Sequence, residues 1–193
     1  MAGSSEQREA IVSAAGELFA KLGLEKTTME DIGAASHKAK SSLYYYFRSK
    51  EDIFAEVIRR EIVGLQEKIL KEMKREGDPY NRFRTFVMTK MSYLIEKQSK
   101  YVAIREDYLK NYDFISSLTE DYCEWELNLI EGILSYGRDR GAFNVVDTKG
   151  SSRALYFAIK GMEYPWVVNF SRREIERGID LLVDILLAGI RAA

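Results

Sequence analysis

The stretch TTMEDIGAASHKAKSSLYYYFRSK, residues 27–50, decides the fold of this chain. Its apolar residues recur at helical spacing in two short runs, one around Ile32 and one from Leu43 to Phe47. The polar triplet at 36–38 interrupts that spacing and predicts a tight turn. Two helices joined by so short a turn must cross steeply, so the stretch predicts helix-turn-helix geometry.

Two capping patterns predict where helices begin in this region. Thr27 precedes Glu30 by three residues, which fits a capping box at the start of the first helix. Ser49 precedes Asp52 by the same interval, so we expect the next helix to start there.

The same stretch is locally basic. No acidic residue lies between Asp31 and Glu51, whereas four basic residues and three consecutive tyrosines do. Phosphate groups accept hydrogen bonds from cationic side chains and from neutral hydroxyls alike, so the window favours contact with a nucleic-acid backbone. A solvated face would be the plainer interpretation of the charge alone; the turn pattern reverses that preference. The basic residues are Lys38, Lys40, Arg48 and Lys50.

Length and composition limit which classes of protein this chain can belong to. At 193 residues the chain can form one or two small domains with a buried core. Its net charge is −1, so any attraction to nucleic acid must be local. A single cysteine cannot form an internal disulfide, which fits the cytoplasm. We expect no membrane partner, because no apolar run reaches the roughly 18 residues that a membrane helix needs.

The rest of the chain predicts helices only, because it has two prolines and no sustained alternation of apolar and polar residues. Gly23 should end the first helix, and Pro165 should kink the eighth. We expect about nine helices in all, the two of the turn motif and seven others. The other expected helices cover about 6–22, 50–75, 79–98, 101–112, 114–140, 148–169 and 172–191.

Residues 8–58 resemble the DNA-binding domain of TetR-family (TetR/AcrR) transcriptional regulators, above all in IVSAAGELFAKLGLEKTTMEDI and SSLYYYFRSKEDIFAEVI. The likeness covers the Gly23 helix stop, the paired threonines, the Leu-Tyr-x-x-Phe block and the Ser-Lys-Glu restart. The family usually carries Gly and then Val in the turn, where this chain has His37 and Lys38. Histidine tolerates left-handed backbone better than bulky residues do, and the stem of a lysine can pack while its ammonium reaches water.

The resemblance implies an all-α protein with a helix-turn-helix DNA-binding domain of three helices at 1–56 and a helical ligand-binding and dimerisation domain at 57–193. The second helix of the motif would enter the major groove, where Lys40 would donate to guanine O6 and N7. The alternative is that Tyr44 to Tyr46 only cover the core. Leu43 and Phe47 are the better candidates for core residues. The DNA-contacting residues implied are Thr28, Lys40, Ser41, Ser42, Tyr44, Tyr45 and Lys50.

The resemblance also implies a cavity for a small apolar or amphipathic effector in the second domain. Aromatic residues at helical spacing usually form core, yet some of those here would line the cavity. Residues 127–170 are faintly similar to fatty-acyl-CoA-responsive members. The last two helices would form a four-helix homodimer interface, and a two-fold dimer reads a palindromic operator. The expected ligand-lining residues are Phe86, Met91, Tyr108, Tyr122, Trp125, Leu129, Tyr156, Met162 and Trp166.

The predicted function is therefore a ligand-responsive transcriptional regulator, a repressor that its effector releases from DNA. We expect neither an enzyme nor a metal or cofactor, because the chain has one histidine and no phosphate-binding glycine motif. Two alternatives stay open. One is a dimeric small-molecule-binding or adaptor protein that has lost DNA binding, and the other is a cofactor-free enzyme that uses the aromatic pocket.

Overall fold

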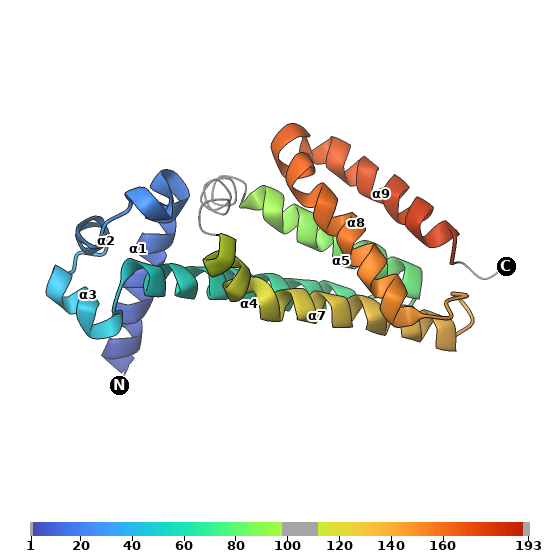
Figure 1. Ribbon diagram of the computed structural model, residues 1–193, viewed down its shortest axis with the longest axis horizontal. Coiled ribbons are helices and arrows are strands. Elements are labelled where there is room, and N and C mark those ends of the chain that lie inside the picture. Colours follow the sequence, from blue (N-terminus) through green and yellow to red (C-terminus); the bar gives the residue numbers. More distant parts are fainter. Residues whose placement is uncertain (1, 98–111, 191–193) are drawn as a thin grey trace. The chain divides into compact units, whose positions relative to one another are not determined.

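The computed structural model describes residues 2–97 and 112–190, and in these ranges every regular element is a helix (Figure 1). The all-α prediction is confirmed, with eight helices in the described ranges against about nine predicted. The helix predicted at 101–112 falls almost entirely outside the described residues. The helices are α1 (Ala2–Lys26), α2 (Met29–Ala35), α3 (Lys40–Tyr46), α4 (Lys50–Met73), α5 (Pro79–Glu96), α7 (Tyr112–Asp139), α8 (Thr148–Asn169) and α9 (Arg172–Ala188).

The chain divides into two compact units. Met1–Val63 and Lys97–Thr119 belong to the first, which we call the N-terminal unit. Gly64–Glu96 and Glu120–Ala193 belong to the second, the C-terminal unit. Helices α4 and α7 therefore each contribute residues to both units. The domain boundary predicted between residues 56 and 57 stays a prediction.

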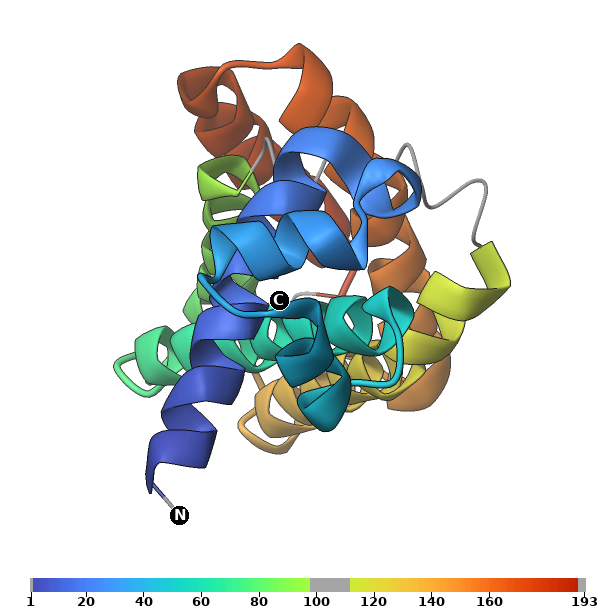
Figure 2. The same ribbon diagram turned by 90° about the vertical axis from the view of Figure 1, so that its left-hand side faces the viewer.

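The core of the N-terminal unit holds α1, α2, α3 and the start of α4 together (Figures 1 and 2). The rings of Phe19 and Phe54 meet edge to face, with centroids 5.1 Å apart. Leu43 and Phe47 are buried in the same cluster, as predicted, and anchor α3. Because both anchors lie on one side of this short helix, its opposite side remains at the surface.

One end of α1 lies where the sequence predicts it, and the other does not. Gly23 has φ 79°, a region that glycine enters without strain, and interrupts the helix at the predicted stop. The start lies at Ala2 instead of the predicted Glu6. Helix starts are weakly determined by sequence where the leading residues are small and polar.

The capping box predicted at the start of α2 is wrong by one residue. Thr28, not Thr27, is the N-cap; its hydroxyl accepts from the backbone N–H of Asp31, whose carboxylate accepts from the N–H of Thr28. The hydroxyl of Thr27 is buried and donates to the carbonyl of Gly23 at 2.7 Å. Glu30 pairs with Lys40 instead.

The C-terminal unit packs α5 against α8 and α9, which run antiparallel to each other (Figure 1). The side chains of Asp78, Asp147 and Ser171 cap the starts of its helices, and the last forms a full capping box with Glu174. Helix α8 continues through Pro165 to Asn169. In the described ranges, every helix is either too short or too polar to cross a lipid bilayer.

Candidate functional site

The turn between α2 and α3 is formed, even though His37 and Lys38 stand where the family usually has Gly and Val. His37 takes φ 55°, in the left-handed region. The N–H of Lys38 donates to the carbonyl of Gly33 at 2.9 Å, and the hydroxyl of Ser36 donates to that of Ile32 at 2.7 Å. A Cβ on Gly33 would lie only 2.9 Å from the carbonyl oxygen of Lys38. The close approach of the two helices therefore depends on glycine at position 33.

Helix α3 presents a polar and aromatic face to solvent. Lys40 and Ser41 are exposed, and Ser42 is half-buried. Tyr45 is 80% exposed and Tyr44 is also exposed, so neither covers the core. The residues of this helix that are predicted to contact DNA thus lie together at the surface. Their hydroxyl and ammonium groups can donate hydrogen bonds to a bound molecule.

Lys40 has an internal partner in the absence of DNA. Its ammonium forms an ion pair with Glu30, across the turn, and lies 6.0 Å from the ring centroid of Tyr44. Hydrogen bonding between the two side chains lowers the pKa of Glu30 and raises that of Lys40. A DNA acceptor must therefore compete with this carboxylate.

The two other predicted phosphate-contacting residues lie on different elements. The Thr28 hydroxyl is exposed but donates to Asp31 at 2.7 Å. The Lys50 ammonium donates to three backbone carbonyls after the break in α1, those of Leu24, Glu25 and Thr27, at 2.8, 3.0 and 3.1 Å. An ammonium has three donors, so Lys50 satisfies the orphan carbonyls at a helix end. Its contact with DNA stays a prediction.

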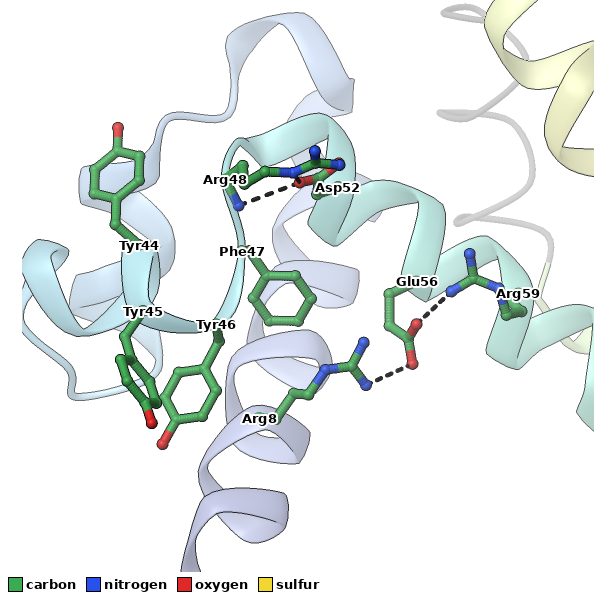
Figure 3. A pocket seen from close by; sticks show the side chains of 9 residues that line it. All are labelled: Arg8, Tyr44, Tyr45, Tyr46, Phe47, Arg48, Asp52, Glu56 and Arg59. Atoms are coloured by element: carbon green, nitrogen blue, oxygen red, sulfur yellow. Dashed lines mark hydrogen bonds and ion pairs between the residues drawn. The ribbon is translucent and has the colours of Figure 1, made fainter.

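A surface hollow of about 360 Å³ adjoins α3 on the side of α1 and α4 (Figure 3). Tyr45 and Tyr46 point the same way and their rings meet edge to face, whereas Tyr44 points elsewhere (Figure 3). Arg48 is 91% exposed, and Asp52 accepts from its Nε at 3.1 Å. The hollow's three guanidinium groups outnumber its two carboxylates. Its lining residues are Arg8, Tyr44, Tyr45, Tyr46, Phe47, Arg48, Asp52, Glu56 and Arg59.

Glu56 organises the wall of this hollow. Its carboxylate accepts from Arg8 on α1 at 2.9 Å and pairs with Arg59 on its own helix (Figure 3). It also pairs with Arg60, one turn further along α4. The hydrogen bond from Arg8, with the other guanidinium groups, lowers the pKa of Glu56 to about 2. Arg8 in turn lies 5.0 Å from the ring centroid of Phe47. These contacts tie α1 and α4 to the base of α3.

The predicted ligand-lining residues, apart from Tyr108, lie on α5, α7 and α8 of the C-terminal unit. Tyr108 falls outside the described residues. Trp166 borders a hollow of about 250 Å³ lined by residues of α8, α9 and the segment that joins them. Whether any of them binds a ligand stays a prediction. Phe86, Met91, Tyr122 and Tyr156 are buried, and Trp125, Leu129, Met162 and Trp166 are half-buried.

The sequence analysis missed a buried charged cluster in this unit, formed by Lys90, Glu126 and Glu163. A signal for it was present, because each charge stands on an apolar helical stripe. Lys90 follows Phe86 by four residues, and Glu126 follows Tyr122 by four. A charged residue at such a position is seldom fully buried unless it is paired.

Comparison with known proteins finds a family match over the helix-turn-helix and similar proteins over most of the chain. Residues 11–57 match the family described as bacterial regulatory proteins, tetR family. The chain is 20% identical over 185 residues to the fatty acid metabolism regulator protein of Bacillus subtilis, with 93% of each covered. It is 26% identical over 161 residues to the HTH-type transcriptional regulator QacR of Staphylococcus aureus, covering 80% of this chain and 83% of that protein.

Solved structures share the fold. A TetR transcription regulator from Haloarcula marismortui matches with a TM-score of 0.82 at 19% identity, over 97% of this chain and 99% of that one. At this identity the likeness is one of fold. The tetR-family match itself covers residues 11–57, which form the helix-turn-helix with its closed turn and the exposed face of α3.

Proposed function

We propose that this chain is a homodimeric, ligand-responsive repressor that reads a palindromic operator through α3. The exposed face of α3 carries the proposal, because Lys40, Ser41, Tyr44 and Tyr45 stand at the surface on a helix whose other side is anchored in the core. A helix of this kind fits the major groove, and its first residues face the base edges. The relatives are regulators of transcription, so we assign DNA binding in the cytoplasm and no catalysis.

Roles within the interface follow from the chemistry of each side chain. Lys40, at the start of α3, reads guanine, and the serines beside it add weaker discrimination. Tyr44 donates to phosphate. We add Arg48, the most exposed guanidinium of the hollow beside α3, as a further phosphate contact. Thr28 contacts phosphate at the edge of the interface, and Lys50 holds the segment that carries Thr28 in place through its three carbonyl contacts.

The dimer interface is proposed to lie on α8 and α9. Large apolar side chains stand exposed on these two helices, with Ile185 71% and Phe157 68% exposed. Several exposed apolar residues on one pair of helices are typical of an interaction surface. The other exposed apolar residues here are Val168 on α8, Phe170 just after α8 and Leu181 on α9.

Release from DNA is proposed to follow effector binding in the C-terminal unit. Helix α4 is continuous from the N-terminal unit into the C-terminal unit, so one rigid element belongs to both. A ligand that binds one orientation of α4 more tightly than another shifts the population toward that orientation. The distance between the two copies of α3 then no longer matches the spacing of the half-sites, and affinity falls.

In vitro selection from random duplex DNA tests the proposal, carried out at two salt concentrations. We expect an enriched palindrome whose affinity falls steeply as salt rises, since Lys and Arg displace counterions from phosphates. Size-exclusion chromatography with light scattering of the same protein should show a dimer. A dimer that selects no sequence and binds DNA at neither salt concentration would instead favour a small-molecule-binding or adaptor protein.

A further inference from the structure

The hollow beside α3 lies wholly within the N-terminal unit, because every residue that lines it falls between residues 1 and 63. Its walls come from α1, from α3 with the residues just after it, and from the first half of α4 (Figure 3). Its volume of about 360 Å³ lies within the range of about 300–1,000 Å³ that small-molecule sites occupy. A small organic molecule therefore fits it.

The hollow carries an excess of one positive charge. Its lining has three guanidinium groups and two carboxylates. Arg60, which lies outside the lining and pairs with Glu56, also pairs with Glu9, so these two further groups leave the excess unchanged. An anion with a single charge would neutralise the hollow, whereas a cation would add to its charge.

Two of the guanidinium groups are held in position by one carboxylate. Arg8 and Arg59 donate to different oxygens of Glu56, one from α1 and the other from α4 (Figure 3). The hydrogen bond from Arg8 lowers the pKa of Glu56 to about 2, so this carboxylate stays charged at neutral pH. A guanidinium group has five N–H donors, and Arg8 and Arg59 each use one of them on a carboxylate of the described residues. Their remaining donors are available to an acceptor in the hollow.

The side of the hollow next to α3 is aromatic. The rings of Tyr45 and Tyr46 meet at 87° with centroids 4.9 Å apart, and Tyr45 is 80% exposed. Rings that meet edge to face form a corner into which another flat ring can pack. Arg48 stands beside this corner, and its Nε donates to Asp52, which leaves its two terminal nitrogens without a partner among the described residues. The hollow thus combines an apolar corner with an excess of hydrogen-bond donors.

We propose that this hollow binds a small aromatic carboxylic acid in its anionic form. The carboxylate accepts from the guanidinium groups that Glu56 holds, since guanidinium and carboxylate match in geometry. The ring packs against Tyr45 and Tyr46. One carboxylate matches the excess of one charge, whereas a phosphomonoester would bring about two negative charges.

The bound acid competes with DNA. Tyr45 and Arg48 line the hollow and also belong to the proposed DNA interface. An acid in the hollow occupies their surroundings and places a negative charge where a phosphate would approach, so each ligand lowers the affinity for the other. This competition rests on the proposed function, whereas binding of the acid does not.

The test uses the full-length protein and probes that separate the charge from the ring. Isothermal titration calorimetry would compare naphthoate with its neutral amide, naphthamide, and with acetate, which has the charge without the rings. We expect naphthoate to bind at least about fivefold more tightly than either, because a partly exposed ion pair and a ring contact each contribute about that factor.

Variants then locate the carboxylate of the probe. Arg8→Gln and Arg59→Gln each remove one guanidinium group while Glu56 keeps its other partners, and each should weaken naphthoate binding at least about threefold and leave naphthamide binding unchanged. Arg75→Gln is the matched control, because Arg75 forms an exposed pair with Glu72 at the same spacing of three residues, in the C-terminal unit. Circular dichroism confirms that each variant folds; if one does not, the ranking of probes on the unaltered protein decides.

Fluorescence anisotropy with the selected operator tests the competition. Saturating naphthoate should weaken operator binding at least about threefold, whereas naphthamide, and acetate at equal ionic strength, should not. The effect of naphthoate should disappear in Arg59→Gln. Operator affinity that saturating naphthoate leaves unchanged would overturn the competition.

Three results would overturn the binding site itself. They are no measurable binding of naphthoate, naphthamide bound as tightly as naphthoate, and naphthoate binding unchanged in both glutamine variants, which would place the acid elsewhere. If naphthoate does not bind and Arg59→Gln weakens operator binding, the hollow serves a DNA phosphate only, and the proposed function stands without the acid. Naphthoate binding that both variants weaken, in a protein that binds no operator, refutes only the repressor.

Discussion

Replacing Gly33 by alanine should damage the turn between α2 and α3 more than it damages the fold. The added Cβ would lie 2.9 Å from the carbonyl oxygen of Lys38, closer than such atoms approach in proteins. The carbonyl oxygen belongs to backbone, the Cβ is fixed directly to the backbone of α2, and the Lys38 N–H also bonds to the Gly33 carbonyl. No flexible side chain is available to move away, so the two helices must separate.

Two opposing effects set the size of the change. Alanine favours a helix interior over glycine by about 0.5–1 kcal/mol, and forcing an extra carbon into a packed contact costs about 1–3 kcal/mol. Gly132 in α7 provides a matched control, because a Cβ there meets nothing within 4 Å. Gly132→Ala should therefore gain about 0.5–1 kcal/mol, and the two variants should differ by about 1–3 kcal/mol in free energy of unfolding.

Urea unfolding followed by circular dichroism measures that difference, and fluorescence anisotropy with the selected operator measures the effect on the reading helix. We expect Gly33→Ala to bind the operator at least about tenfold more weakly, because a small displacement of α3 misplaces every base contact. Gly132→Ala should bind normally. Equal stability of the two variants, with operator affinity unaltered in Gly33→Ala, would refute the close approach of the helices as the basis of the motif.

Three further predictions concern charged groups of the N-terminal unit. Lys50→Ala should lower the free energy of unfolding by about 1–3 kcal/mol, because three carbonyls lose a charged donor; urea unfolding measures this, and a change confined to DNA affinity would contradict it. Glu30→Gln should raise operator affinity a few-fold by releasing Lys40, and the double variant with Lys40→Ala should lose that gain in anisotropy titrations. Glu56 has its pKa lowered from 4.5 to about 2 in the folded state, so its contribution is complete above pH 4.5 and is lost as the pH falls toward 2. Glu56→Gln should therefore remove about 3 kcal/mol of the acid-dependent loss of stability over that interval, and an unchanged pH profile would show that the pairing with Arg8 contributes nothing.

Local sequence was sufficient where a helix end is decided by neighbours in the chain. The bounds predicted for α8 agree with Thr148–Asn169, because Asp147 caps the first turn through its own carboxylate. The capping box at Ser171 was likewise readable from Ser and Glu three residues apart. In each case the donor, the acceptor and the spacing all lie within one turn of helix.

Local sequence was insufficient where two neighbouring residues fit the same pattern. Thr27 and Thr28 each precede an acidic residue by three positions, and only the burial of Thr27 against the Gly23 carbonyl leaves Thr28 as the cap. Lys50 is a similar case. Its sequence position matches a phosphate contact, but the carbonyls that hold it become neighbours only when α1 and α4 pack together.

The free protein already satisfies the cationic groups around α3, and this determines how the interface must work. Lys40 pairs with Glu30, Arg48 with Asp52, and Lys50 with backbone carbonyls. Binding DNA therefore exchanges one set of acceptors for another, and the free energy gained is the difference between phosphate and the internal partner. Exposed pairs contribute little to stability, so the exchange at Lys40 and Arg48 costs little. Three hydrogen bonds from one ammonium, two of them part-buried, cost more to break. We accordingly expect the salt dependence of operator binding to arise mainly from Lys40 and Arg48, with Lys50 remaining on its carbonyls in the complex.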